Sequence, residues 1–198
     1  MMQKKENLRT KQKQETRRKL MDAAIDLFMS RGYEAVSLEQ VAEHAQIHVQ
    51  TLYRHFKNKS MLACAYFDSG IDQIIYQLDR VSPQQDAYRV WKKSSLSGLN
   101  SIVNGANSLQ LFQMIHANPE LLAHNLSYAR KVEDKLTEVL QKQEDRLHLN
   151  PHVSRLLAAS MTTAYRESHY SWIYSDGKVS SVDMLNEYFE VIEKTFDL

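Results

Sequence analysis

Glycine and proline are scarce in this chain, at five and three of 198 residues, and this scarcity limits what the chain can fold into. The long stretches between these breakers carry apolar residues at three- and four-residue spacing, which is the pattern of helices with one buried face. Strands would need strict alternation and frequent turn residues. The chain is therefore expected to be all-α, with about nine helices.

One face of a first helix is marked by Leu20, Ala24 and Phe28. Their spacing predicts a helix from about residue 16 to residue 30. Gly32 follows this segment, and glycine readily adopts the left-handed backbone that ends many helices. A first core helix that stops at the glycine is therefore expected.

Two short helices are predicted next, separated by about three residues. Ser37 and Gln40 have the spacing of a capping box, in which each side chain binds the backbone amide of the other residue. The helix that they start ends near Ala45, and the next one runs from about residue 48 to 55. Such a pair after a longer helix is typical of the helix-turn-helix, whose second helix enters the major groove of DNA.

The remainder of the chain is expected to be a helical body. Asn58 has the position of a cap for a long helix over about residues 59–80, and the few later breakers divide residues 83–198 into about five helices. The predicted domains are a basic N-terminal arm at 1–14, a three-helix helix-turn-helix domain at 15–58, and a C-terminal helical ligand-binding and dimerisation domain at 59–198.

Charge is distributed unevenly along the chain. The net charge is +1, but residues 1–60 carry +5 and the rest carries −4. This asymmetry suggests that the N-terminal part meets a polyanion, although a chance distribution over solvated faces gives the same totals. A basic arm ahead of the first helix either reaches the minor groove or backbone of DNA or is a solvated tail; its cations are Lys4, Lys5, Arg9, Lys11 and Lys13.

Several classes of protein are excluded by what the sequence lacks. Cys64 is the single cysteine, which rules out an internal disulfide. Its side chain is expected to be a small buried apolar group. The histidines show no metal-ligand spacing, and the five glycines form no phosphate loop, so neither a metal, a cofactor nor an enzyme is predicted. No signal peptide and no apolar run of membrane-spanning length is present, and a cytoplasmic protein is expected.

Residues 32–59 read GYEAVSLEQVAEHA followed by QIHVQTLYRHFKNK, and this segment resembles the TetR family of transcriptional regulators. The resemblance is dense over residues 16–65. Two positions depart from the family pattern, because Gln46 stands where glycine is usual and His48 stands where serine or threonine caps the second short helix. The resemblance implies a sequence-specific DNA-binding regulator, expected to be a repressor.

Side chains at the start of the second short helix are the expected readers of bases. Val49 can pack on a thymine methyl group, and Gln50 can pair with adenine through two hydrogen bonds. The resemblance supports phosphate contacts by a further set, which is Ser37, Thr51, Tyr53, His55 and Lys59. The alternatives are that Ser37 acts only as a helix cap, that His55 packs as a neutral ring and that Lys59 is a solvated charge.

The resemblance also implies a cavity for a small-molecule effector of unknown identity among the middle helices. Fourteen of the eighteen aromatic residues follow residue 60, which suits either a large core or a pocket lining. For most of the candidate pocket residues, ordinary packing in the core is the alternative. The candidates are Tyr88, Trp91, Phe112, Met114, His116, His124, Tyr128, Tyr165 and His169.

Dimerisation is predicted through the last two helices, at about 152–174 and 181–196, because their apolar faces are broader than one thin layer of helices covers. The expected interface residues are Leu157, Met161, Trp172, Leu185, Tyr188, Phe189 and Ile192. A two-fold homodimer predicts a palindromic double-stranded operator, released when the effector binds. In the alternative function, the same DNA-binding fold has a C-terminal domain that binds a protein partner instead of a small molecule.

Overall fold

The computed structural model describes residues 2–82, 85–143 and 150–198, with side chains from Arg9 onward. Within these residues the chain forms nine helices and no strand, so the all-α prediction is confirmed. The helices form two compact units. Unit 1 contains Met1–Tyr66 and Met114–His124, and unit 2 contains Phe67–Gln113 and Asn125–Leu198. The sequence-based boundary at residue 58 thus lies within unit 1.

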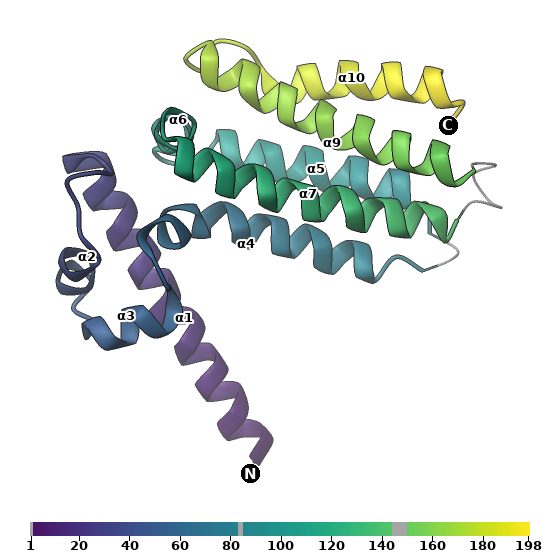
Figure 1. The fold of residues 1–198 in the computed structure, drawn as a ribbon. Helices are drawn as coiled ribbons and strands as arrows, with labels where there is room; N and C mark the ends of the chain where they lie inside the picture. Colours follow the sequence, from purple (N-terminus) through teal and green to yellow (C-terminus); the bar gives the residue numbers. More distant parts are fainter. Residues whose placement is uncertain (1, 83–84, 144–149) are drawn as a thin grey trace. The chain divides into compact units, whose positions relative to one another are not determined.

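Unit 1 is built on one long helix (Figure 1). Helix α1 spans Met2–Arg31, so it begins well before the expected start near residue 16, and the segment predicted as an arm is its N-terminal half. Gly32 ends the helix at a φ of 83°, as the sequence indicates. Helices α2 (Leu38–His44) and α3 (Val49–His55) follow, and the first turns of α4 (Lys59–Asp79) complete the unit.

The two short helices of unit 1 have defined ends. The capping box of α2 is confirmed, because the Gln40 amide donates to Ser37 Oγ at 3.3 Å and the Ser37 amide donates to Gln40 Oε1 at 2.8 Å. Helix α3 is capped by His48, whose Nδ1 accepts from the Gln50 amide at 3.3 Å. An imidazole nitrogen therefore accepts the hydrogen bond that a serine or threonine oxygen more commonly accepts at this position.

The turn between α2 and α3 holds a residue in an unusual backbone conformation. Gln46 has a φ of 54°, in the left-handed region that costs a residue with a Cβ about 1–2 kcal/mol. The turn is fixed on both sides, because the Gln46 amide donates to the Glu43 carbonyl at 3.0 Å and the Ile47 amide donates to the Ala42 carbonyl at 2.9 Å. The strain is therefore balanced by neighbouring hydrogen bonds and packing.

Unit 2 is a helical bundle that contains most of α4, and the described residues after 84 form five further helices, as the sequence predicts. They are α5 (Ala87–Val103), α6 (Ser108–Ala117), α7 (Pro119–Gln141), α9 (Pro151–Tyr174) and α10 (Ser181–Phe196). Helix α10 packs against α9 and α5. The last residues of α6 and the first of α7 belong to unit 1. No helix in the described residues is long and apolar enough to span a membrane.

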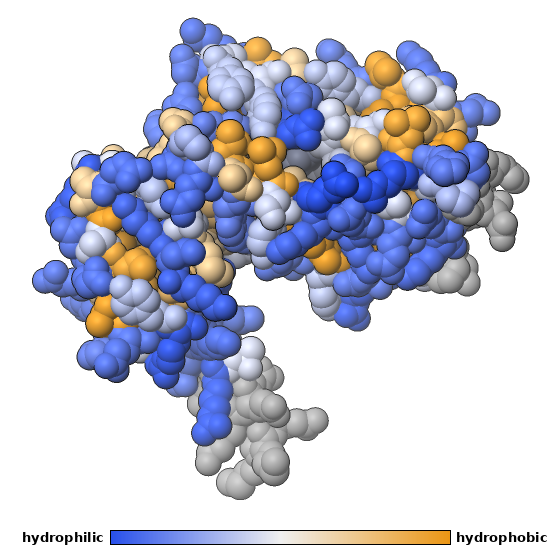
Figure 2. Space-filling model, viewed as in Figure 1, coloured by the Kyte–Doolittle hydropathy of each residue, from blue (hydrophilic) through white to orange (hydrophobic). Residues whose placement is uncertain are grey.

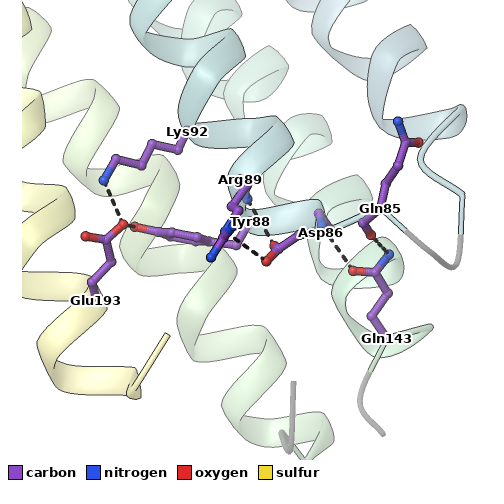
Figure 3. Close-up of polar contacts among 8 residues, drawn as sticks. Gln85, Asp86, Tyr88, Arg89, Lys92, Gln143 and Glu193 are labelled. Atoms are coloured by element: carbon purple, nitrogen blue, oxygen red, sulfur yellow. Dashed lines mark hydrogen bonds and ion pairs between the residues drawn. The ribbon is translucent and has the colours of Figure 1, made fainter. Parts of the chain in front are cut away.

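Polar contacts fasten the N-terminal end of α5 to its neighbours (Figure 3). The Tyr88 hydroxyl donates to Glu193 Oε1 at 3.1 Å, and Lys92 Nζ lies 2.6 Å from the same oxygen. On the other side, Gln143 accepts from the Ala87 amide at 3.0 Å and donates to the Gln85 carbonyl at 2.7 Å. Both burial and proximity to Glu193 raise the pKa of Tyr88.

The residues expected at a dimer interface lie mostly in the core of a single chain. Leu157, Met161, Leu185 and Phe189 are completely buried, Trp172 and Ile192 are nearly so, and Tyr188 packs partly buried against the same cluster. Helices α5 and α7 contribute to that cluster, so the broad apolar faces of α9 and α10 are covered within one chain. Other apolar side chains of these two helices remain exposed, namely Leu156, Tyr174 and Val191, and Figure 2 shows apolar residues among hydrophilic ones on the viewed surface.

We expect Gln46→Gly to stabilise the protein by about 0.5–1 kcal/mol. Glycine removes the left-handed strain but makes the unfolded chain more flexible, so only part of the strain energy is recovered. Gly32→Ala is the matched control, because its φ of 83° lies in the same region and an added Cβ would meet no atom within 4 Å. Urea unfolding should show opposite signs for the two variants. An unchanged or lower stability of Gln46→Gly would contradict the strain argument.

Candidate nucleic-acid interface

The N-terminal end of α3 presents side chains to solvent. Gln50 is exposed and Val49 is partly exposed, while Leu52 on the opposite side is completely buried. The Gln50 backbone amide donates to His48 Nδ1 at 3.3 Å, which caps the first turn of the helix, and Gln50 itself remains exposed. The two residues predicted to read bases therefore stand at the accessible end of a helix fixed from behind.

Tyr53 links α3 to α2 through a side-chain contact that the sequence did not predict. Its hydroxyl donates to Glu39 Oε1 at 2.7 Å, and its side chain is 47% exposed. This hydrogen bond raises the pKa of Tyr53 and lowers that of Glu39. The hydroxyl proton is therefore engaged by a carboxylate, and a phosphate that approached Tyr53 would also approach the negative charge of Glu39.

Lys59 is held in place, and no carboxylate of the described residues forms an ion pair with it. Its Nζ donates to the Glu34 carbonyl at 3.3 Å and lies 4.2 Å from the centre of the Tyr33 ring. Asn118 donates to the Glu34 side chain at 2.9 Å and so fixes the same loop. Lys59 is therefore a cation held in a defined position and not a freely solvated charge.

His55 lies in a cationic environment at the end of α3. Its pKa is lowered, first by burial and then by the positive charges of Arg17, Lys13 and Arg54. Arg54 donates to Thr51 Oγ1 at 3.0 Å, which orients its guanidinium group along α3. Arg54 was not among the predicted site residues, although its place one turn after Gln50 on the same helix face was a usable signal.

The candidate effector residues are divided between the two units. Met114, His116 and His124 lie in unit 1, where burial lowers the pKa of His116. The six others lie in unit 2. Tyr88 there binds Glu193, and the Tyr128 hydroxyl donates to Asp72 at 3.4 Å. The nine candidates therefore do not all belong to one compact unit.

Four of these residues form an aromatic cluster in unit 2. The centres of the Phe112 and His169 rings are 4.0 Å apart, those of Tyr165 and His169 are 6.0 Å apart, and those of Trp91 and Tyr165 are 6.3 Å apart. Burial raises the pKa of Tyr165 to about 12. Trp91 Nε1 is buried and has no hydrogen-bond partner among the described residues. An unsatisfied buried donor is costly, and a ligand with an acceptor would relieve that cost.

The described residues include two hollows whose linings contain no residue of the aromatic cluster. One, of about 360 Å³, is in unit 1 between α1 and α3. The other, of about 120 Å³, is in unit 2 and is lined mainly by residues of α4 and α7, including Asp79, Lys135 and Val139. Cys64 is buried, as expected, with its thiol 3.9 Å from the Leu121 carbonyl. Within the described residues, no group of three or more potential metal ligands comes together.

Comparisons with known proteins agree with this geometry. Residues 20–66 match the family model described as bacterial regulatory proteins, tetR family. The chain is 28% identical over 145 residues to the HTH-type transcriptional regulator TcmR of Streptomyces glaucescens, a match that covers 69% of this chain and 64% of TcmR. It therefore spans less than two thirds of that relative. The fatty acid metabolism regulator protein of Bacillus subtilis (strain 168) is 22% identical over 193 residues, which cover 92% of this chain and 96% of that protein.

Solved structures share the fold at low sequence identity. SmeT, the repressor of the Stenotrophomonas maltophilia multidrug efflux pump SmeDEF, matches in its triclosan complex with a TM-score of 0.71 at 15% identity, over 91% of this chain and 90% of SmeT. FadR from Bacillus subtilis in complex with stearoyl-CoA matches with a TM-score of 0.62 at 18% identity, over 88% of this chain and 96% of FadR. The helical arrangement of this chain is thus that of known regulators.

We expect Glu39→Gln to tighten binding to duplex DNA of any sequence by roughly two- to five-fold, because it removes a negative charge beside Tyr53. Fluorescence anisotropy with a labelled duplex measures the change. Asp22→Asn is the control, since it removes an exposed carboxylate of α1 that makes no ion pair among the described residues. Equal affinities for the two variants would contradict a DNA surface at Tyr53 and Glu39.

Proposed function

We propose that the chain is a member of the tetR family of bacterial regulatory proteins, whose model matches residues 20–66, and that it acts in the cytoplasm as a homodimeric repressor. It binds a palindromic double-stranded operator and releases it when a small molecule binds the C-terminal domain. In this proposal residues 15–58 form the DNA-binding domain and residues 59–198 form the regulatory and dimerisation domain. The homologues and fold neighbours are regulators and not enzymes.

One observation carries the DNA-binding part of the proposal. Helix α3 presents Val49 and Gln50 at its free N-terminal end, while Leu52 anchors its other side. A helix in the major groove contacts base edges with the side chains of its N-terminal end. Val49 and Gln50 are therefore assigned to reading bases, and the surrounding set of Ser37, Thr51, Tyr53, His55 and Lys59 is assigned to phosphates.

The effector part of the proposal is supported by the chemistry of unit 2 and by the relatives. Triclosan and stearoyl-CoA, bound by SmeT and FadR, both have extensive apolar parts. The aromatic cluster of Trp91, Phe112, Tyr165 and His169 offers a matching surface, and the buried indole N–H of Trp91 offers one unused donor. A ligand acts as an inducer if it binds the form that cannot hold DNA more tightly.

The dimer part of the proposal is supported by exposed apolar side chains on the last two helices. Leu156 on α9 is 59% exposed, and Val191 on α10 is 60% exposed. Isolated exposed apolar residues are common, but two helices at the end of a chain that both carry them suit a four-helix contact between two copies. Inverted half-sites in the operator follow from the two-fold symmetry of such a dimer.

The alternative function keeps the DNA-binding unit and assigns unit 2 to a protein partner. Its specific support is close packing at the aromatic cluster, since Phe67 packs on Phe112 with the two ring centres 3.9 Å apart. A small molecule that bound there would first have to separate these side chains. Under the alternative, no small molecule changes DNA affinity.

The assignment of base readers is tested by comparing Gln50→Ala with Lys59→Ala. A duplex selected by the wild-type protein from a random-sequence pool provides the specific site, and a scrambled duplex provides the reference. Gln50→Ala should relax the preference at one base pair by about 1–3 kcal/mol. Lys59→Ala should weaken binding to both duplexes alike. A uniform loss in Gln50→Ala would show that Gln50 does not read a base.

The effector assignment is tested by a thermal-shift screen that includes triclosan and stearoyl-CoA. A ligand present at one hundred times its Kd should stabilise the protein by about 2.7 kcal/mol, and the same ligand should weaken DNA binding. Trp91→Phe keeps an aromatic ring but removes the unused N–H, so a ligand that accepts from it should stabilise this variant less. If no stabilising compound changes DNA affinity, the protein-partner alternative is favoured.

A further inference from the structure

The hollow in unit 1 lies between the N-terminal half of α1 and the recognition helix α3. It measures about 360 Å³ and is lined by three residues from each helix, namely Gln12, Lys13, Thr16, Thr51, Arg54 and His55. We call it the α1–α3 cleft. In Figure 1, α3 lies beside α1, and the N-terminal half of α1 continues beyond it. Every residue of the cleft belongs to unit 1.

We propose that α1 is itself a DNA-binding element, and that the α1–α3 cleft holds a backbone phosphate of the duplex that α3 reads. The proposal rests on the proposed function, since it needs a duplex bound to α3. Lys13 and Arg54 join the residues already assigned to phosphates. The neutral Gln12 side chain is a weaker hydrogen-bond donor to the same phosphate. This contact strengthens binding and fixes the position of the protein along the duplex, but it does not distinguish one base sequence from another.

The charge of the cleft is positive and is not cancelled by acidic partners. Lys13 and Arg54 line it and are exposed, and Arg17 stands next to it. Among the described side chains, no carboxylate forms an ion pair with any of these three cations. Burial lowers the pKa of His55, and the positive charges of Arg17, Lys13 and Arg54 lower it further. An uncompensated cationic hollow favours an anion.

The hydrogen-bonding groups of the cleft are also arranged for an acceptor such as phosphate. Arg54 is oriented by its bond to Thr51 Oγ1 at 3.0 Å, which leaves other guanidinium N–H groups free to donate. The Thr16 hydroxyl donates to the Gln12 carbonyl at 2.9 Å and so completes the helix side of the cleft. The Arg17 guanidinium group lies 4.4 Å from the centre of the Phe56 ring, so it packs on that ring and does not line the cleft.

The place of the cleft on α3 fits the geometry of a duplex. Arg54 lies one turn after Gln50 on the same face of the helix, while Thr51 and His55 lie on the adjacent face. When the N-terminal end of a helix contacts base edges, side chains farther along it meet the sugar-phosphate backbone that borders the groove. Lys13 then approaches that backbone from α1.

Phosphate binding in the cleft couples DNA affinity to pH through His55. The free protein disfavours the charged imidazole because of burial and the cations Arg17, Lys13 and Arg54. A bound phosphate offsets those charges and raises the pKa of His55 in the complex. The complex therefore takes up a proton, and affinity rises as the pH falls through the pKa of His55 in the complex toward its lower pKa in the free protein.

The experiment measures the dependence of Kd on salt for the full chain with the selected duplex and with the scrambled duplex. Lys13→Ala should lower the slope of log Kd against log salt by about 0.9 and weaken binding to both duplexes alike. Arg18→Ala is the matched control, because Arg18 is an exposed cation of α1 on the face opposite the cleft. Circular dichroism confirms that both variants are folded.

Two outcomes overturn the inference. One is a slope for Lys13→Ala that equals the slope for Arg18→Ala. The other is an unchanged pH dependence in His55→Gln, which should lose the tightening at low pH. In either case, a wild-type protein that still prefers the selected duplex leaves the proposed function intact. If the wild-type protein shows no preference for any duplex, the proposed function itself fails.

Discussion

The recognition helix is stable only because its ends and one side are held, since seven residues are too few to maintain a helix in water. Leu52 supplies the buried side, and Phe56 closes the C-terminal end with its amide bonded to the Leu52 carbonyl at 2.9 Å. His48 supplies the N-terminal cap. Every DNA contact assigned to α3 depends on these three anchors, because side chains on a frayed helix have no fixed register.

Two cations of unit 1 are positioned by aromatic rings and not by carboxylates of the described residues. Arg17 lies over Phe56, and Lys59 lies over Tyr33. A carboxylate partner would fix a cation equally well but would cancel its charge, whereas a ring fixes it and leaves the charge available. A surface of this kind is ordered before it meets a polyanion. Glu39, which accepts a hydrogen bond from the Tyr53 hydroxyl, instead brings negative charge to unit 1.

Local sequence patterns predicted local structure well. Ser37 and Gln40 are three residues apart, so their capping box could be read directly, whereas Tyr53 and Glu39 are fourteen apart and nothing in the pattern links them. Periodicity also shows that a face is buried without showing what covers it. Met161 and Phe189 were therefore assigned to a partner chain, although both are completely buried in the core of a single chain.

Both tryptophans of the chain, Trp91 and Trp172, are buried in unit 2, and unit 1 contains none. The tryptophan fluorescence of the protein therefore originates entirely from the interior of unit 2. Trp172 stacks near His169, whose ring centre is 5.8 Å away, and the Trp91 ring stands edge-on to Tyr165. Emission wavelength and intensity respond to rearrangement of this interior. The protein thus carries an optical reporter confined to the domain assigned to sensing.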